Sequence, residues 1–262
     1  MAFFSESNFY QLFIKASILA VNNYNMWYER LLNELSENYY SQVFLFVAEV
    51  MALVLGILYA RKYKAGRLFI FYIAFDLAIM VIDWFLIAFP FYPKKIISLF
   101  AYITNTLVAL VELGVYFYFF SLVITRKDIK KTLLLLFAFF FLIVLVYILT
   151  RFHFLSIRYR YMSYIIGALE FLLLIFPCIV YFRQALNNAT SMSIIEKPSF
   201  WIVTGIFIFS TISIPAYLIL SYIAVYKNIL SPLFSATLYY VPFAINFLFL
   251  SKAFLCRKPL TI

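Results

Sequence analysis

Five carboxylic acids stand inside long apolar stretches of the sequence, where ionisable side chains are rare. They are Glu49, Asp76, Asp83, Glu112 and Glu170. No lysine or arginine occupies the middle of any of these stretches. Because an isolated charge is costly in an apolar medium, each acid must be protonated, hydrogen-bonded to a neutral group, hydrated or bound to a cation. The chemistry indicated is proton or cation coupling, a pH-sensitive switch or a pocket for a polar ligand.

Polar residues in these stretches recur at an interval of seven, which places both members of a pair on one face of a helix. The pairs are Asp76 with Asp83, Asn105 with Glu112, and Tyr239 with Asn246. Together with Glu49 and Glu170 they predict a two-layer polar seam inside a helical bundle, which binds a ligand or protons. The alternative is that these groups join helices by hydrogen bonds worth about 1–2 kcal/mol or less each. Five acids without a basic partner favour a functional role.

A second candidate site is the connecting segment 151–162, with the sequence RFHFLSIRYRYM. Its basic side chains Arg151, His153, Arg158 and Arg160 alternate with aromatic residues. Such a segment suits an anionic ligand or a lipid headgroup. The alternative is an interfacial connection whose arginines extend to lipid phosphates.

The elements that position these residues follow from composition. Of the 262 residues, 66% are hydrophobic and 12% are charged, against roughly 45–50% and about 25% in soluble domains. This excludes a soluble enzyme, a disordered chain and a nucleic-acid-binding domain, despite the net charge of +10. Seven runs are long enough to cross a bilayer: 42–60, 68–89, 96–124, 132–150, 162–182, 200–224 and 232–254. The predicted fold class is an all-α polytopic membrane protein, a seven-transmembrane helix bundle.

The distribution of lysine and arginine predicts the orientation of this bundle. One set of alternate loops with the C-terminal end holds 13 of these residues, and the other set with the N-terminal segment holds 8. The N-terminal segment 1–41 is therefore expected outside and the tail 255–262 in the cytoplasm. Residues 9–21 are apolar but contain Lys15 and reach only about 20 Å as a helix. We expect a short interfacial helix there, with an uncleaved anchor as the alternative.

Several known chemistries lack their residues in this chain. A single histidine and two cysteines argue against a metal site or a disulfide framework. A glycine-rich phosphate loop is missing from the sequence, and the last span has no central lysine for a retinal Schiff base. The motifs of G-protein-coupled receptors are missing too. We therefore expect a protein that is not an enzyme and has no cofactor.

Three segments carry a resemblance to a known group of proteins. They are LVELGVYFYFF (110–120), KPSFWIVTGIFIF (197–209) and INFLFLSKAFLCRK (245–258). These resemble uncharacterised seven-span inner-membrane proteins of Bacteroidota, a family without an established activity. The resemblance highlights Glu112, Trp201 and Asn246. It implies a bacterial inner membrane, and association with signalling kinases as a possible context.

The sequence as a whole favours a non-enzymatic, receptor-like membrane sensor or signalling protein. Its acidic seam would sense a ligand or protons, and a separate membrane or cytoplasmic partner, such as a signalling kinase, would carry the output. Beyond that partner, the expected surroundings are the lipid bilayer, with no nucleic acid. One alternative is a small proton- or cation-coupled transporter that uses the same carboxylates. Another is a structural subunit of a larger membrane complex.

Overall fold

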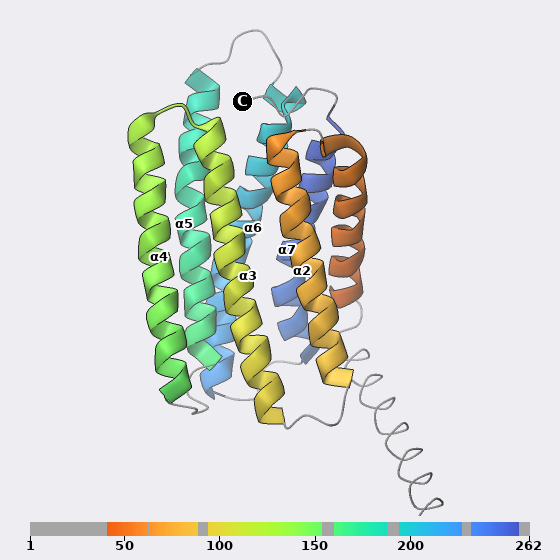
Figure 1. Ribbon diagram of the computed structural model, residues 1–262, viewed down its shortest axis with the longest axis vertical. Helices are drawn as coiled ribbons and strands as arrows, with labels where there is room; N and C mark the ends of the chain where they lie inside the picture. The colour runs from red at the N-terminus through yellow and green to blue at the C-terminus, as the bar shows by residue number, and fades with distance from the viewer. Residues whose placement is uncertain are drawn as a thin grey trace, which may run out of the picture.

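The computed structural model describes residues 41–61, 63–88, 94–153, 160–187, 194–226 and 232–256. Within these ranges all regular elements are helical, and seven helices are long and apolar enough to cross a membrane. The first is Ser41–Ala60, whose last turn is the π-helix η1 (Gly56–Ala60). The others are α2 (Lys64–Ala88), α3 (Lys94–Val123), α4 (Lys127–His153), α5 (Arg160–Asn187), α6 (Pro198–Tyr226) and α7 (Pro232–Phe254), with a short 3-10 turn η3 (Ile194–Glu196) before α6. The predicted seven-helix bundle is confirmed (Figure 1).

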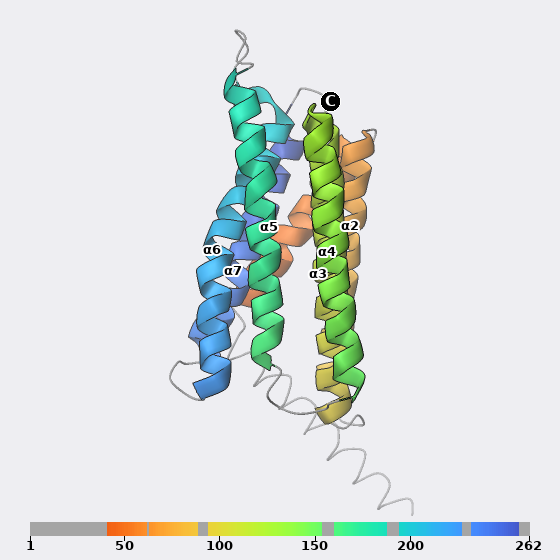
Figure 2. The same cartoon turned by 90° about the vertical axis from the view of Figure 1, so that its left-hand side faces the viewer.

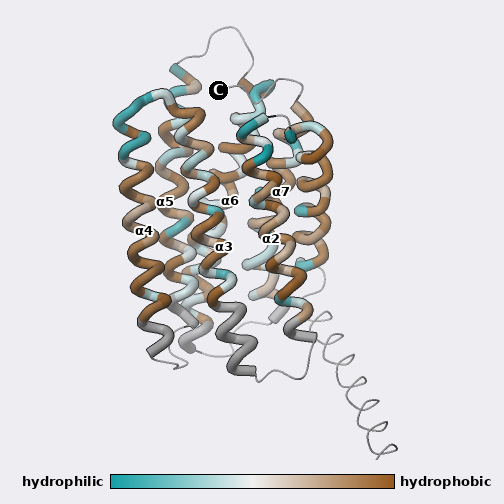
Figure 3. Tube along the Cα trace, viewed as in Figure 1, coloured by the Kyte–Doolittle hydropathy of each residue, from teal (hydrophilic) through white to brown (hydrophobic). Residues whose placement is uncertain are grey.

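The helices are apolar around most of their circumference because one side meets other helices and the other side meets lipid. The helix α4 illustrates this: Phe140 and Val144 are fully buried, while Leu134 and Leu135 are 69% and 70% exposed. Figure 3 shows the same helix as hydrophobic along its length and hydrophilic at its start. That hydrophilic start is the basic sequence that the lysine and arginine count placed at an end of the bundle.

The helices are arranged so that α3 packs against α2, α4 and α5, while α5, α6 and α7 pack in succession. The end of the first span contacts both α2 and α7 and so closes the bundle. The helix α4 lies outside this ring, against α3 and α5 (Figures 1 and 2). The interior is therefore enclosed by the first span, α2, α3, α5, α6 and α7.

Two aromatic groups fill this interior. One joins Phe69 and Tyr72 of α2 to Tyr116 and Phe119 of α3, and Tyr72 also stacks on Phe247 of α7. The other, which we call the α5–α7 aromatic group, consists of Phe171, Phe209, Tyr217, Tyr239 and Phe243. Their ring centroids lie 4.7–6.3 Å apart, within the range of favourable aromatic contacts.

Some predictions concern residues beyond the described ranges. The expected interfacial helix at 9–21 and the tail residues 257–262 lie outside them. Which end of the bundle faces the cytoplasm remains the prediction made from the lysine and arginine distribution.

Candidate functional site

Three glutamates from three different helices are buried at the centre of the bundle. Glu49 of the first span is 1% exposed, and Glu112 of α3 and Glu170 of α5 are 2% exposed. Each has one carboxyl oxygen without a hydrogen-bond partner: Glu49 Oε2, Glu112 Oε1 and Glu170 Oε1. A buried oxygen without a partner loses the hydrogen bonds that water would give it. The arrangement is costly for stability alone, as is typical of functional sites.

Asp76 of α2 connects these glutamates. It is half-buried and lies near enough to Glu49 and to Glu112 for electrostatic interaction with both. Glu112 interacts in the same way with Glu170. We call Glu49, Asp76, Glu112 and Glu170 the four-carboxyl cluster. In the described part of the chain, no lysine or arginine is among the groups that act on these carboxyls.

The cluster is a series of carboxyl groups rather than a chelate. Among the described residues, no three histidine, cysteine, aspartate or glutamate side chains are arranged to hold a metal ion. Four helices each contribute one acid, so a change of charge at one carboxyl is felt by the acid of a neighbouring helix. The carboxyl groups are thus electrostatically connected from helix to helix.

Two tyrosines extend the cluster, and the sequence analysis missed both. Tyr72 precedes Asp76 by one helical turn in α2, and Tyr116 follows Glu112 by one turn in α3. Their rings meet edge to face with centroids 5.8 Å apart. The hydroxyl of Tyr72 faces the Glu112 carboxyl and the Tyr116 hydroxyl without making a hydrogen bond of ordinary geometry.

Asn246 of α7 completes this polar centre. It is fully buried, and its Nδ2 donates a hydrogen bond to the hydroxyl of Tyr116. Its own carbonyl oxygen has no hydrogen-bond partner and faces Gly205 of α6. Asn246, Tyr116, Tyr72 and Glu112 thus form a continuous polar path from α7 through α3 and α2.

The remaining members of the predicted seam differ in how they relate to this centre. Asp83 is half-buried and interacts with Thr104 of α3. Tyr239 lies in the α5–α7 aromatic group, where it stacks on Tyr217 with centroids 5.7 Å apart. Its ring also meets Tyr240 edge to face at 5.0 Å. Asp83 therefore lies apart from the four-carboxyl cluster, whereas Tyr239 lies near enough to Asp76 for electrostatic interaction with it.

Asn105 departs from the prediction of a buried seam. It lies two helical turns from Glu112 on the same face of α3, yet its side chain is exposed. A position on a shared face is buried only where another helix covers it, and among the described residues none buries the Asn105 side chain, although its neighbours Thr104 and Thr106 are buried. Asn105 therefore lies at the surface and Glu112 at the buried centre, with the apolar residues Val108 and Ala109 between them on the same face of α3.

The second candidate site lies outside the described residues. Arg158 falls in the undescribed segment 154–159, and the side chains of Arg151, His153 and Arg160 are not described. The alternation of basic and aromatic residues there stays a prediction.

Comparison with known proteins does not extend this picture. The chain matches no known protein family, no curated protein and no solved structure. The deciding observation is its seven long apolar helices. The chain is a polytopic membrane protein. Its resemblance to seven-span proteins of Bacteroidota gains no support from the comparisons.

Proposed function

We propose that this polytopic membrane protein is a non-enzymatic sensor that responds to protonation, or to a polar ligand, at the four-carboxyl cluster. The single observation that carries the proposal is the burial of Glu49, Glu112 and Glu170 on three helices, each with an unpartnered carboxyl oxygen and, in the described part of the chain, no lysine or arginine acting on it. A sensor needs a group whose charge depends on conditions and whose charge alters the packing of the fold.

The cluster meets the second requirement because its members lie on different helices. In a low-dielectric interior, two like charges repel strongly, and an ionised carboxyl without a partner is costly. Loss or gain of a proton at Glu112 therefore changes the favourable separation of α3 from the helices that carry Asp76 and Glu170. Such a change biases the bundle between two packings.

An access route to the cluster would start at Asn105, on the face of α3 that this residue shares with Glu112. Asn105 is exposed at one end of this face, and Glu112 is buried two turns away. A proton or a small polar ligand entering at Asn105 meets Glu112 first. Glu112 interacts electrostatically with Asp76, which in turn interacts with Glu49, and on the other side Glu112 interacts with Glu170.

Output would pass to a separate partner at the end of the bundle that carries the basic connections 61–67 and 125–131. These connections hold Arg61, Arg67, Arg126 and Lys127, whose side chains are exposed. Following the lysine and arginine rule, we place this end in the cytoplasm of a bacterium. The resemblance to Bacteroidota proteins supports a signalling kinase as the class of partner.

A proton- or cation-coupled transporter is the second candidate. It is favoured by the same series of acids, because carboxyl groups on four helices offer successive positions for a moving proton. The two functions differ in what crosses the membrane. Only a transporter acidifies or loads a sealed vesicle when a gradient is applied.

Copurification at different pH values tests the sensor directly. Protein crosslinked in native membranes should retain a partner in amounts that depend on pH, and Glu112→Gln should abolish that dependence. The exposed acid Glu196, outside the cluster, provides the matched control Glu196→Gln. Gradient-driven uptake in proteoliposomes that is lost in Glu112→Gln would instead establish the transporter. A partner yield that is the same at every pH would contradict the sensor.

A further inference from the structure

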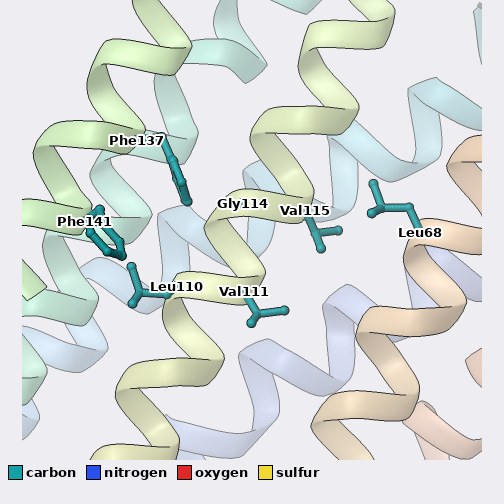
Figure 4. Close-up of a pocket in the computed structure, with 7 residues that line it drawn as sticks. All are labelled: Leu68, Leu110, Val111, Gly114, Val115, Phe137 and Phe141. Carbon is teal, nitrogen blue, oxygen red and sulfur yellow. The ribbon is translucent and has the colours of Figure 1, made fainter. Parts of the chain in front are cut away.

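A groove on the lipid-facing side of α3 has features that the four-carboxyl cluster does not explain. It has a volume of about 400 Å³ and is lined by residues of α2, α3 and α4. Figure 4 shows its lining side chains: Leu68, Leu110, Val111, Gly114, Val115, Phe137 and Phe141. All are apolar, and Gly114 leaves α3 without a side chain between Leu110, Val111 and Val115 (Figure 4).

The groove has a polar rim at one end. On α2, Lys64 precedes Leu68 by one turn and shares its face. On α3, Tyr118 follows Gly114 by one turn, and the Nζ of Lys64 lies 5.4 Å from the centre of the Tyr118 ring. On α4, Lys130 precedes Phe137 by two turns on the same face. The three helices are antiparallel neighbours, so Lys64, Tyr118 and Lys130 all lie towards the same end (Figure 1).

The charge at this end is strongly unbalanced. The segments 61–67 and 125–131 contain eight lysines and arginines and a single acid, Asp128. Asp128 is exposed in the first turn of α4, where it faces the positive end of the helix dipole. The excess of positive charge therefore lies at the end of the bundle towards which the rim of the apolar groove faces.

We propose that this groove binds an anionic phospholipid, with one acyl chain along Gly114 and the phosphate between Lys64 and Lys130. A phospholipid with a negative headgroup and apolar acyl chains matches this site, because the rim is basic and the lining of the groove is apolar. The half-exposed ring of Tyr118 lies at the junction, where the hydroxyl can reach the headgroup region and the ring can contact the acyl chain. This lipid site is independent of the proposed sensor.

Lipid binding to the intact protein tests the proposal. Detergent-purified protein is titrated with dioleoyl phosphatidylglycerol or with dioleoyl phosphatidylcholine, and bound lipid is counted by native mass spectrometry. The expected result is one phosphatidylglycerol bound at least about fivefold more tightly than phosphatidylcholine. Equal affinity for the two lipids would overturn the proposal.

Variants locate the site. Lys64→Gln with Lys130→Gln should weaken phosphatidylglycerol binding by about tenfold or more and leave phosphatidylcholine unchanged. Gly114→Leu should weaken both lipids, because a Cβ at Gly114 lies 3.4 Å from the ring of Phe137 and the longer side chain enters the groove. The control is Arg183→Gln, an exposed charge on α5. A lysine double variant that binds phosphatidylglycerol as tightly as Arg183→Gln does would contradict the proposed lipid site. The site would also be contradicted if the lipid-free protein is a dimer and Gly114→Leu disrupts that dimer.

Discussion

The side-chain amide of Asn246 in α7 donates a hydrogen bond to the hydroxyl of Tyr116 in α3, 130 residues away along the chain. Both side chains are fully buried. This bond joins two helices across the interior of the bundle and directs the Tyr116 ring towards Tyr72 and Glu112. The polar centre is thus held by a neutral pair, and Glu49, Glu112 and Glu170 beside it each keep one carboxyl oxygen without a hydrogen-bond partner.

We predict that Asn246 and Tyr116 are energetically coupled. The variants Tyr116→Phe and Asn246→Leu should each lower the free energy of unfolding in a membrane mimetic. A double-mutant cycle should give a coupling energy of about 0.6 kcal/mol or more, the usual scale for interhelical hydrogen bonds in membranes. Strictly additive effects of the two substitutions would show that the bond contributes nothing to stability.

Two glycines should be intolerant of a methyl group. A Cβ at Gly167 would overlap the ring of Tyr217, which is fixed between Tyr164, Phe171 and Tyr239. Because that ring cannot move aside, Gly167→Ala should destabilise the protein by about 1–3 kcal/mol. Gly205→Ala should behave similarly, because its Cβ would overlap the Cβ of Phe249.

Gly114→Ala is the matched control for these substitutions. Its Cβ would lie 3.4 Å from the nearest atom of Phe137, close to ordinary contact. Alanine is favoured over glycine within a helix by roughly 1 kcal/mol, so this variant should be neutral or stabilising. Thermal unfolding in nanodiscs compares the stabilities of Gly167→Ala, Gly205→Ala and Gly114→Ala. A Gly167→Ala variant as stable as Gly114→Ala would contradict the packing of α5 against α6.

Cys256 offers a test of membrane orientation. It lies just beyond the end of α7 and is partly exposed, while Cys178 is fully buried. A membrane-impermeant maleimide should therefore label Cys256 in inverted inner-membrane vesicles and not in intact cells, and Cys256→Ser should remove the signal. Labelling of intact cells would place the C-terminal end of α7 outside and overturn the predicted orientation.

The labelling rate should also depend on pH in a defined direction. Partial burial raises the pKa of the Cys256 thiol above its usual value, and nearby Lys252 offsets only part of this effect. The thiol also donates to the carbonyl oxygen of Lys252 at 3.5 Å. Because the thiolate is the reactive form, the rate should be low at neutral pH. The labelling rate should rise with pH and level off only at pH values above the usual pKa of a cysteine thiol.

The seven spans were predictable from the sequence because a run of apolar residues long enough to cross a bilayer has few other stable structures. The predicted run 42–60 and the observed helix Ser41–Ala60 end at the same residue, and the described part of the chain begins at Ser41. Differences occur at polar ends: α2 begins at Lys64, inside the basic connection, rather than at residue 68. Helices continue past the apolar run because backbone hydrogen bonds extend the helix into the interface.

The candidate site was predictable only in part. The rarity of acids within spans identified Glu49, Glu112 and Glu170, and their burial agrees with the expected polar interior. Spacing along one helix placed Asn105 with Glu112, but it carries no information on where neighbouring helices cover that face. Long-range packing decides that question.

Tyr72 and Tyr116 were missed for a different reason. Tyrosine in a membrane protein is expected at the interface, where its ring and hydroxyl meet apolar and aqueous surroundings. A signal was nevertheless present. Tyr72 lies four residues before Asp76, and Tyr116 lies four residues after Glu112, so each tyrosine shares a helix face with an acid. A tyrosine one turn from an intramembrane acid can therefore indicate a polar centre.

The four-carboxyl cluster has a natural reporter in Trp84. Its ring lies 5.5 Å from that of Phe46, so it spans the contact between α2, which carries Asp76, and the first span, which carries Glu49. Substitution of Trp27 and Trp201 by phenylalanine leaves Trp84 as the sole tryptophan. Asp83 adjoins Trp84 and is itself an acid, so the reporter should also carry Asp83→Asn.

The most direct measurement is the fluorescence of Trp84 in nanodiscs, followed from acidic to alkaline pH. We predict a sigmoidal change in emission as the charge of the cluster shifts the first span against α2. Glu49→Gln and Glu112→Gln should abolish the change, and Glu196→Gln should preserve it. An emission that stays constant with pH, or a change that persists when Glu49, Asp76 and Glu112 are all replaced by their amides, would contradict a protonation-driven rearrangement.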